Sequence, residues 1–177
     1  MAWKEKEFEE KMRPYIDVIY QKTFKNISKI LRVNREEKTN SKFMIMDRDL
    51  AIDTHLYFRD GTLLTFQEKT RQHIYQKYQD FTFEYQNDPQ KNVPGEWFKL
   101  ASQLYFFGYA NEAQTGYLQW WILNVPRLRL FLLNVIGIET LKSKYLRPNK
   151  PPAKANFFAI PFNLLKTAED IVVFLYQ

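Results

Sequence analysis

Hydrophobic side chains recur at three- and four-residue steps near the start of the chain, which is the period of one face of an α-helix. The apolar positions of this face are Phe8, Met12, Tyr15, Ile16 and Ile19. The pattern predicts a helix over residues 3–24. Pro14 lies inside it. Because proline lacks the N–H that a helix interior uses, we expect a kink or a break near Arg13.

The spacing of hydrophobic positions changes to alternation between Lys42 and Arg71, which predicts β-strands there. Residues 25–42 contain the polar stretch NREEKTNSK and are predicted to be a connection. Asp60 and Gly61 lie between two apolar-rich runs, and this dipeptide in such a setting is typical of a β-hairpin turn. The region therefore predicts two antiparallel strands joined by a tight turn.

The length of the hairpin loop decides which side chains share a face of the sheet. A two-residue loop would pair Asp53 with Glu68 and mix apolar and polar side chains on each face. A three-residue loop, 59–61, would pair Asp53 with Gln67 and put Gly61 at a left-handed position that suits glycine. One face would then carry Ile52, Leu56, Phe58, Leu64 and Phe66, and the other Asp53, His55, Tyr57, Thr65, Gln67 and Lys69. Because this separation is what a half-buried hairpin requires, the pattern favours the three-residue loop.

The remainder of the chain is rich in aromatic residues, and its periodicity is less decisive. Three stretches fit either a helix or a strand: 72–88, 97–113 and 126–146. Strands are predicted at 116–125 and 157–162, and proline-containing loops at 88–97 and 147–156. Near the end of the sequence, Thr167 followed three residues later by Asp170 predicts a closing helix.

The composition is that of a folded protein, with 45% apolar and 17% aromatic residues. A length of 177 residues favours a single domain over 1–177. The chain has no cysteine, which excludes disulfides, zinc-thiolate sites and cysteine nucleophiles. Polar and charged residues interrupt the most apolar stretch, 116–141, so we expect no membrane span of about 20 residues. The N-terminus lacks the apolar core of a signal peptide, and we expect a cytoplasmic protein.

Asp53, Gln67 and Lys69 converge on one face in the preferred register. A carboxylate is a hard oxygen ligand for Mg²⁺, and the side-chain carbonyl of glutamine supplies a second, neutral oxygen. A nearby lysine can polarise a water molecule or stabilise charge that develops on a phosphate. Together these groups can hydrolyse a phosphodiester. The alternative interpretation is an exposed polar hairpin face that binds nothing, since such alternation is common.

The order of these residues resembles the PD-(D/E)xK superfamily of restriction-endonuclease-like nucleases. Its core pattern is an aspartate in one strand and acid-x-lysine in the next, and here Gln67 occupies the acid position. Family members also carry a glutamate on the preceding helix, often after phenylalanine, which matches Glu9 after Phe8. The resemblance covers roughly residues 5–75.

The resemblance implies an α/β fold in which a central mixed β-sheet is flanked by helices, with a restriction-endonuclease-like core in a single nuclease-like domain. It further implies a Mg²⁺-dependent (or Mn²⁺-dependent) endonuclease in which Glu9, Asp53 and Gln67 bind the metal. Lys69 would assist the attacking water. The alternative is a non-catalytic nucleic-acid-binding or assembly module that keeps this fold, because Gln67 replaces an acid.

The charge balance fits a nucleic-acid partner. The formal net charge is +6, and the isoelectric point is about 9.3. DNA is the expected partner, and the sequence leaves RNA open. Candidate phosphate contacts are Arg71 beyond Lys69, Lys150 and Lys154 on a proline-rich loop, and His55 on the polar hairpin face, where a plain surface histidine is the alternative. The aromatic excess in residues 97–133 could form a self-complementary patch, so we also expect a homodimer.

Overall fold

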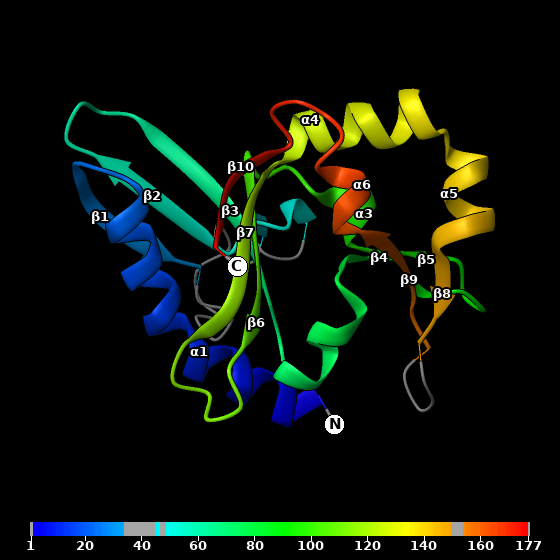
Figure 1. Cartoon of the computed structure of the whole chain (residues 1–177), viewed down its shortest axis with the longest axis horizontal. Coiled ribbons are helices and arrows are strands. Elements are labelled where there is room, and N and C mark those ends of the chain that lie inside the picture. The colour runs from blue at the N-terminus through cyan, green and yellow to red at the C-terminus, as the bar shows by residue number, and fades with distance from the viewer. Residues whose placement is uncertain (1, 34–44, 47–48, 150–153, 177) are drawn as a thin grey trace.

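The computed structural model describes residues 2–33, 45–46, 49–149 and 154–176. The first element is the predicted helix, α1 (Ala2–Thr23). Its apolar periodicity buries Phe8, Met12, Ile16 and Tyr20. The helix is continuous through Pro14, so the chain does not break near Arg13. As a result, α1 presents one uninterrupted apolar face to the sheet beside it (Figure 1).

Six strands form the main sheet, in the order β1-β2-β3-β6-β7-β10. They are β1 (Ile27–Arg32), β2 (Thr54–Phe58), β3 (Leu63–Arg71), β6 (Leu104–Ala110), β7 (Tyr117–Asn124) and β10 (Val172–Tyr176). Neighbouring strands are antiparallel except β3 and β6, which run parallel, so the sheet is mixed. The expected α/β fold with a mixed sheet is therefore confirmed at this level.

The hairpin between β2 and β3 has the predicted three-residue loop. Thr54 pairs with Phe66, and Leu56 pairs with Leu64. Gly61 has a φ of 85°, in the left-handed region that the loop assigns to glycine. This register keeps Gln67 and Lys69 on the face of β3 opposite to Phe66.

A second, antiparallel sheet has the order β5-β4-β9-β8. Its strands are β4 (Asp80–Asp88), β5 (Val93–Pro94), β8 (Leu146–Pro148) and β9 (Asn156–Pro161). The chain leaves β3 through a 3₁₀ turn, η1 (His73–Tyr78), forms β4 and β5, and returns through α3 (Glu96–Lys99) to β6. This excursion makes the crossover that a parallel pair needs.

The stretch 126–146, which fits either a helix or a strand by pattern, is helical. It contains α4 (Val125–Leu130), the π-helical turn η2 (Phe131–Ile136) and α5 (Ile138–Tyr145). The side chain of Asn124 accepts a hydrogen bond from the N–H of Arg127, and Pro126 lies in the first turn, so α4 starts with two ordinary helix-start signals. A short helix, α6 (Phe162–Leu165), follows β9.

Two strands at the edges of the main sheet differ from the predictions. β1 lies within the predicted polar connection. Its charged side chains interrupt the alternation of apolar and polar residues by which a strand is predicted. The predicted closing helix is wrong, because residues 172–176 form β10 against β7. The hydroxyl of Thr167 donates to the carbonyl of Leu164 instead of capping a helix. The β-branched and aromatic run VVFLY fits a strand better than a helix.

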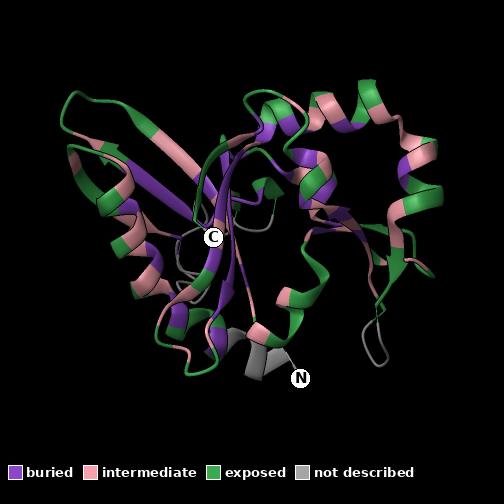
Figure 2. Cartoon of the chain, in the orientation of Figure 1, coloured by how far each residue is buried: buried purple, intermediate pink, exposed green. Residues whose placement is uncertain are grey.

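The core lies on both faces of the main sheet (Figure 2). On one face, α1 packs against Leu56, Phe66, Phe106 and Ile122. On the other, the second sheet and the C-terminal helices pack against Tyr105, Phe107, Tyr109, Trp121 and Leu123. In the described ranges, no helix has the length and apolar character that crossing a membrane requires. On the polar face of the hairpin, Asp53 and His55 are buried, whereas Gln67 and Lys69 are partly exposed and Tyr57 is exposed.

Candidate functional site

Asp53 lies directly before β2 and is only 6% exposed. Its Oδ2 accepts a hydrogen bond of 2.9 Å from the backbone N–H of Glu68. Its own N–H donates to the carbonyl of Phe66 at 2.8 Å. These two contacts tie the residue to β3 at the start of the hairpin. The carboxylate is thus held in a defined orientation by the neighbouring strand.

Gln67 lies on β3, next to the residue that holds Asp53, and is paired in register with Tyr105 of β6. Its Oε1 is buried and accepts no hydrogen bond from any described residue. Leaving a buried acceptor unsatisfied costs about 1–3 kcal/mol, so such atoms call for an explanation. A cation bound at this oxygen is one explanation that fits its chemistry.

Lys69 shares the face of β3 with Gln67, and its charge acts on Glu84 of β4. Burial raises the pKa of the Glu84 carboxyl, the Lys69 ammonium partly offsets that rise, and the charge of Glu96 adds to it. Lys69 therefore lies within electrostatic reach of the second sheet. The strand position predicted for Lys69 is confirmed, and Glu84 is a neighbour that the sequence did not indicate.

The Tyr105 hydroxyl lies within electrostatic reach of both carboxylates predicted from the sequence. Burial raises the pKa of its hydroxyl well above the ordinary value, and the charges of Glu96, Asp53 and Glu9 raise it further. The hydroxyl donates to Oε1 of Glu96 at 2.8 Å. Glu9 is exposed on α1 and acts electrostatically on the same hydroxyl as Asp53. The Tyr105 hydroxyl is therefore bonded to α3 and feels the charges of the hairpin aspartate and the α1 glutamate.

The side chain of Glu68 lies on the face of β3 opposite to Gln67 and is bound there by other side chains. Arg32 donates hydrogen bonds to the carboxylates of Glu68 and Asp17, and Tyr20 donates to Glu68 at 2.9 Å. These contacts bind β1, β3 and α1 together. Glu68 is therefore a structural acid, and its neighbours Gln67 and Lys69 are the residues of this stretch on the face of Asp53.

Any metal site on this face would depend on Gln67. Within the part of the chain that the structure describes, no three histidine, aspartate or glutamate side chains converge closely enough to hold a metal ion. Asp53, directly before β2, and Gln67, on β3, carry one anionic and one neutral oxygen that could bind a cation, and Glu9 is a third candidate from α1. A hard cation such as Mg²⁺ accepts this kind of oxygen set and keeps water in its remaining positions.

His55 differs from its predicted setting. It is 4% exposed, Nδ1 has no hydrogen-bond partner among the described residues, and burial lowers the pKa of the imidazole. The expectation of a surface histidine is wrong, because three successive residues of β2, Thr54 to Leu56, are buried and both faces of the strand are therefore covered at this end. A neutral, buried imidazole is a poor contact for phosphate.

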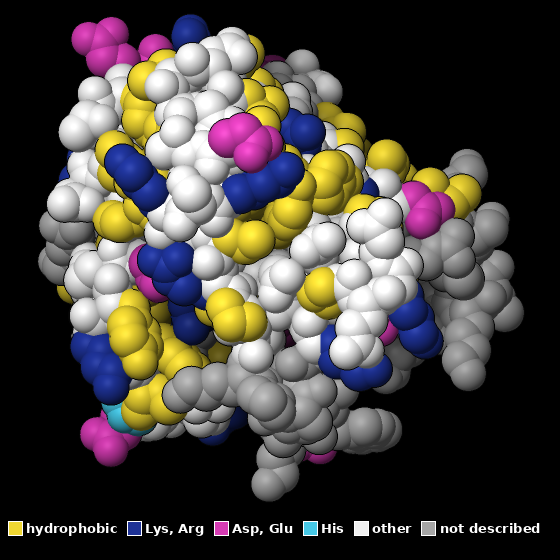
Figure 3. Space-filling view, turned by 90° about the vertical axis from the view of Figure 1, so that its right-hand side faces the viewer, with side chains coloured by type: hydrophobic (Ala, Val, Ile, Leu, Met, Phe, Trp, Pro, Cys, Tyr) yellow, Lys and Arg dark blue, Asp and Glu magenta, His cyan; other side chains and the backbone are white. Residues whose placement is uncertain are grey.

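The other predicted phosphate contacts are dispersed. Arg71 forms an ion pair of 3.3 Å with Asp80 and lies 4.5 Å from the centre of the Tyr75 ring. Lys154 is exposed on the second sheet's side, and Lys150 lies outside the described residues. On the face in Figure 3, lysine and arginine side chains occur in separate groups among hydrophobic ones. Of these residues, only Arg71 lies on the strand that carries Lys69.

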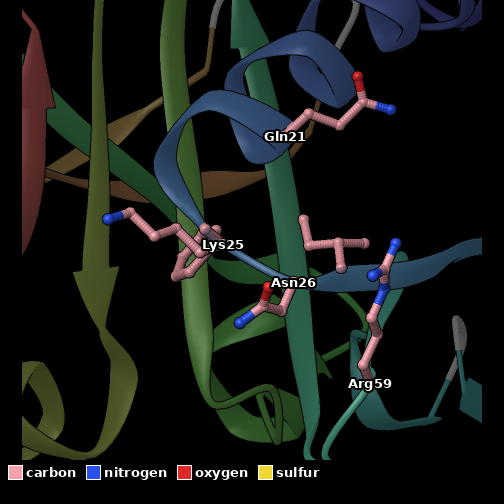
Figure 4. Close-up of a pocket in the computed structure, with 6 residues that line it drawn as sticks. Gln21, Lys25, Asn26 and Arg59 are labelled. Atoms are coloured by element: carbon pink, nitrogen blue, oxygen red, sulfur yellow. The ribbon is translucent and has the colours of Figure 1, made fainter.

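A separate pocket lies at the far end of α1. It is lined by Gln21, Phe24, Lys25, Asn26, Ile27 and Arg59. The nitrogen ends of Lys25 and Arg59 point in different directions in Figure 4 and do not converge on one position. This arrangement does not form a defined anion site.

Glu84, Glu96 and Tyr105 are the members of the site that sequence reasoning missed. They lie in stretches that are ambiguous or read as a loop, and they meet the hairpin only through the β3–β6 pairing and the packing of the second sheet. No spacing in the sequence indicates this. Comparison of the chain with protein family models, with curated proteins and with solved structures finds no match.

Proposed function

We propose that this chain is a Mg²⁺-dependent (or Mn²⁺-dependent) endonuclease that hydrolyses phosphodiester bonds of DNA in the cytoplasm, with a restriction-endonuclease-like core. The observation that carries the proposal is the buried Oε1 of Gln67, which has no hydrogen-bond partner among the described residues, on the same strand as the Glu68 N–H that orients the Asp53 carboxylate. The mixed sheet with α1 on one face supports it at the level of the fold. The net charge of +6 favours a polyanionic substrate.

Each residue of the site has a distinct role in this proposal. Asp53 and Gln67 would hold the metal, with Glu9 as the third ligand from α1. When bound, the metal would lower the pKa of a water molecule and neutralise charge on the phosphate. The Glu68 N–H keeps the Asp53 carboxylate oriented, which saves reorganisation during the reaction. Lys69 would donate a hydrogen bond from Nζ to the attacking water or to a phosphate oxygen.

A second function is favoured by one observation. Glutamine stands where the resembling family has an acid, so the proposed metal site has fewer negative ligands. A non-catalytic nucleic-acid-binding or assembly module would keep the same fold without this chemistry. Such a module would bind DNA with an affinity that falls as salt increases, and would not cleave it with Mg²⁺ or Mn²⁺.

Cleavage of plasmid DNA in Mg²⁺ and in Mn²⁺ separates the two functions. Asp53→Asn keeps an oxygen for the Glu68 N–H but removes the charge, and Lys69→Ala removes the ammonium. We expect both to lower the cleavage rate at least about 100-fold. Lys29→Ala, at an exposed position on β1, is the matched control and should cut like the wild type. Equal cleavage by the wild type and Asp53→Asn would reject the nuclease site.

A further inference from the structure

The 3₁₀ turn η1 exposes aromatic side chains that contribute nothing to the core. None of its residues is buried. Ile74 is 50%, Tyr75 39% and Tyr78 55% exposed, within a turn of six residues. Single exposed apolar residues are ordinary, but clustered ones mark a binding surface. The turn follows β3 directly, so it extends from the strand that carries Gln67 and Lys69.

The two ends of η1 are fixed to the body of the protein. Arg71 at its start forms an ion pair with Asp80 at its end, and the Tyr109 hydroxyl donates to the carbonyl of Asp80 at 2.8 Å. The side chain of Gln79 donates to Gln119 of β7 at 3.0 Å. The turn is therefore held firmly at its base while its aromatic side chains face solvent. A preorganised surface of this kind loses little entropy on binding.

The exposed aromatic rings lie next to two cations, the exposed Lys77 and the partly buried Arg71. The rings of Tyr75 and Tyr78 lie 6.5 Å apart at an interplanar angle of 28°. The guanidinium of Arg71 lies 4.5 Å from the Tyr75 ring centre, and the Lys77 ammonium lies 5.3 Å from that of Tyr78. The acid in contact with this group, Asp80, is paired with Arg71. Flat aromatic faces next to positive charge fit a nucleobase attached to a phosphate backbone.

We propose that η1 binds unpaired nucleobases, so that the proposed nuclease acts on DNA with a single-stranded segment next to the cleaved bond. This inference rests on the proposed function. Bases inside a duplex hide their faces in the stack, whereas unpaired bases can stack on tyrosine. Tyr75 lies six positions after Lys69, so their Cα atoms are at most about 22 Å apart. A short single strand can span that distance and place a phosphodiester at Lys69.

Binding without divalent metal tests the platform separately from cleavage. A fluorescein-labelled oligonucleotide is titrated with protein in EDTA at low salt, as a single strand and as the matching duplex, with fluorescence anisotropy as the readout. We expect the single strand to bind more tightly, and Tyr75→Ala and Tyr78→Ala to weaken that binding about 5- to 100-fold each. Tyr78→Phe keeps the ring and should bind like the wild type.

Leu130→Ala is the control, since Leu130 is 55% exposed on α4 and belongs to a different part of the molecule. Wild-type affinity in Tyr75→Ala and Tyr78→Ala, or a duplex bound as tightly as the single strand, would overturn the platform. Tyrosine-dependent single-strand binding without metal-dependent cleavage would support the platform and reject the nuclease. Cleavage that needs Lys69 but not the tyrosines would support the nuclease and reject the platform. Circular dichroism melting shows whether each variant is folded.

Discussion

Gln67 is the residue on which the proposed site depends most. The hairpin register that places it beside Asp53 follows from the separation of apolar and polar positions, and the structure confirms this register. The isolation of its Oε1 does not follow from the sequence, because it depends on which atoms of β6 and the second sheet surround β3. The strand position of a site residue was therefore predictable, and its hydrogen-bonding environment was not.

Glu68 shows why the motif alone could not decide which acid serves the site. In a two-residue hairpin it would have paired with Asp53. The observed register turns its side chain to α1, where Arg32 and Tyr20 bind it. Arg32 lies in β1, a strand that the sequence pattern did not reveal. The structural role of Glu68 was hidden because its main partner lies 36 residues away in the chain.

Asp80 gives the protein a pH dependence with a defined sign. Burial raises the pKa of its carboxyl, and the Arg71 guanidinium only partly offsets this. The folded protein therefore takes up a proton at higher pH than the unfolded chain, so acidification through this pKa favours folding. We expect the free energy of unfolding of the wild type, relative to that of Asp80→Asn, to increase as pH falls from about 7 to about 4.

Urea unfolding at several pH values measures this difference. Asp80→Asn retains an oxygen for the hydrogen bonds from Arg71 and Tyr109 but does not titrate. The subtraction removes the contribution of most other titrating groups, because they are present in both proteins. A relative stability of the wild type that decreases on acidification would contradict the account and would show that the ion pair with Arg71 outweighs burial.

At the scale of the elements, helices and strands with a clear apolar period were predictable, and edge strands were not. α1 and the β2–β3 hairpin show clean three- to four-residue and two-residue spacing. β1 is half exposed and is held by contacts of Arg32 with other elements. Among the described strands, β10 pairs only with β7. Local patterns describe such edge strands poorly because tertiary pairing stabilises them.

The start of α3 depends on a glycine for space. A Cβ at Gly95 would lie 2.6 Å from the carbonyl oxygen of Glu84, whereas a Cβ at Gly61 would meet open space at a positive φ. We expect Gly61→Ala to cost about 1 kcal/mol through backbone strain. Gly95→Ala should lower the free energy of unfolding more, near the upper end of about 1–3 kcal/mol, because the added Cβ would push α3 away from β4. Urea unfolding of both variants checks the order, and a smaller cost for Gly95→Ala would contradict the packing described.

At the scale of the whole molecule, the aromatic excess is explained by a core on both faces of the main sheet. Trp97, Tyr105, Phe107, Tyr109 and Trp121 are buried against the second sheet. Most of the aromatic residues that motivated a self-complementary patch therefore fill the core of a single chain. The homodimer stays a prediction, and we expect its interface to lie outside these buried aromatic residues.

The free edge of β10 is the surface on which we expect the dimer to form. Val173, Phe174, Leu175 and Tyr176 are exposed, the strand has no charged residue, and no described strand pairs with its outer edge. Such edges pair readily with another strand. We expect the wild type to sediment as a dimer at micromolar concentration and Leu175→Lys to sediment as a monomer. A single wild-type species at 21.4 kDa would contradict a preformed dimer.

The central claim is that Asp53 and Gln67 bind a divalent metal, and a Mn²⁺ soak of crystals tests it most directly. Mn²⁺ accepts the same oxygen ligands as Mg²⁺ and is located by its anomalous scattering. We predict an anomalous peak between the Asp53 carboxylate and Oε1 of Gln67 in the wild type. Gln67→Leu, which has a similar size but no oxygen, should retain the fold and lose the peak. The absence of a peak at Gln67 in the wild type, or an unchanged peak in Gln67→Leu, would contradict the proposed metal site.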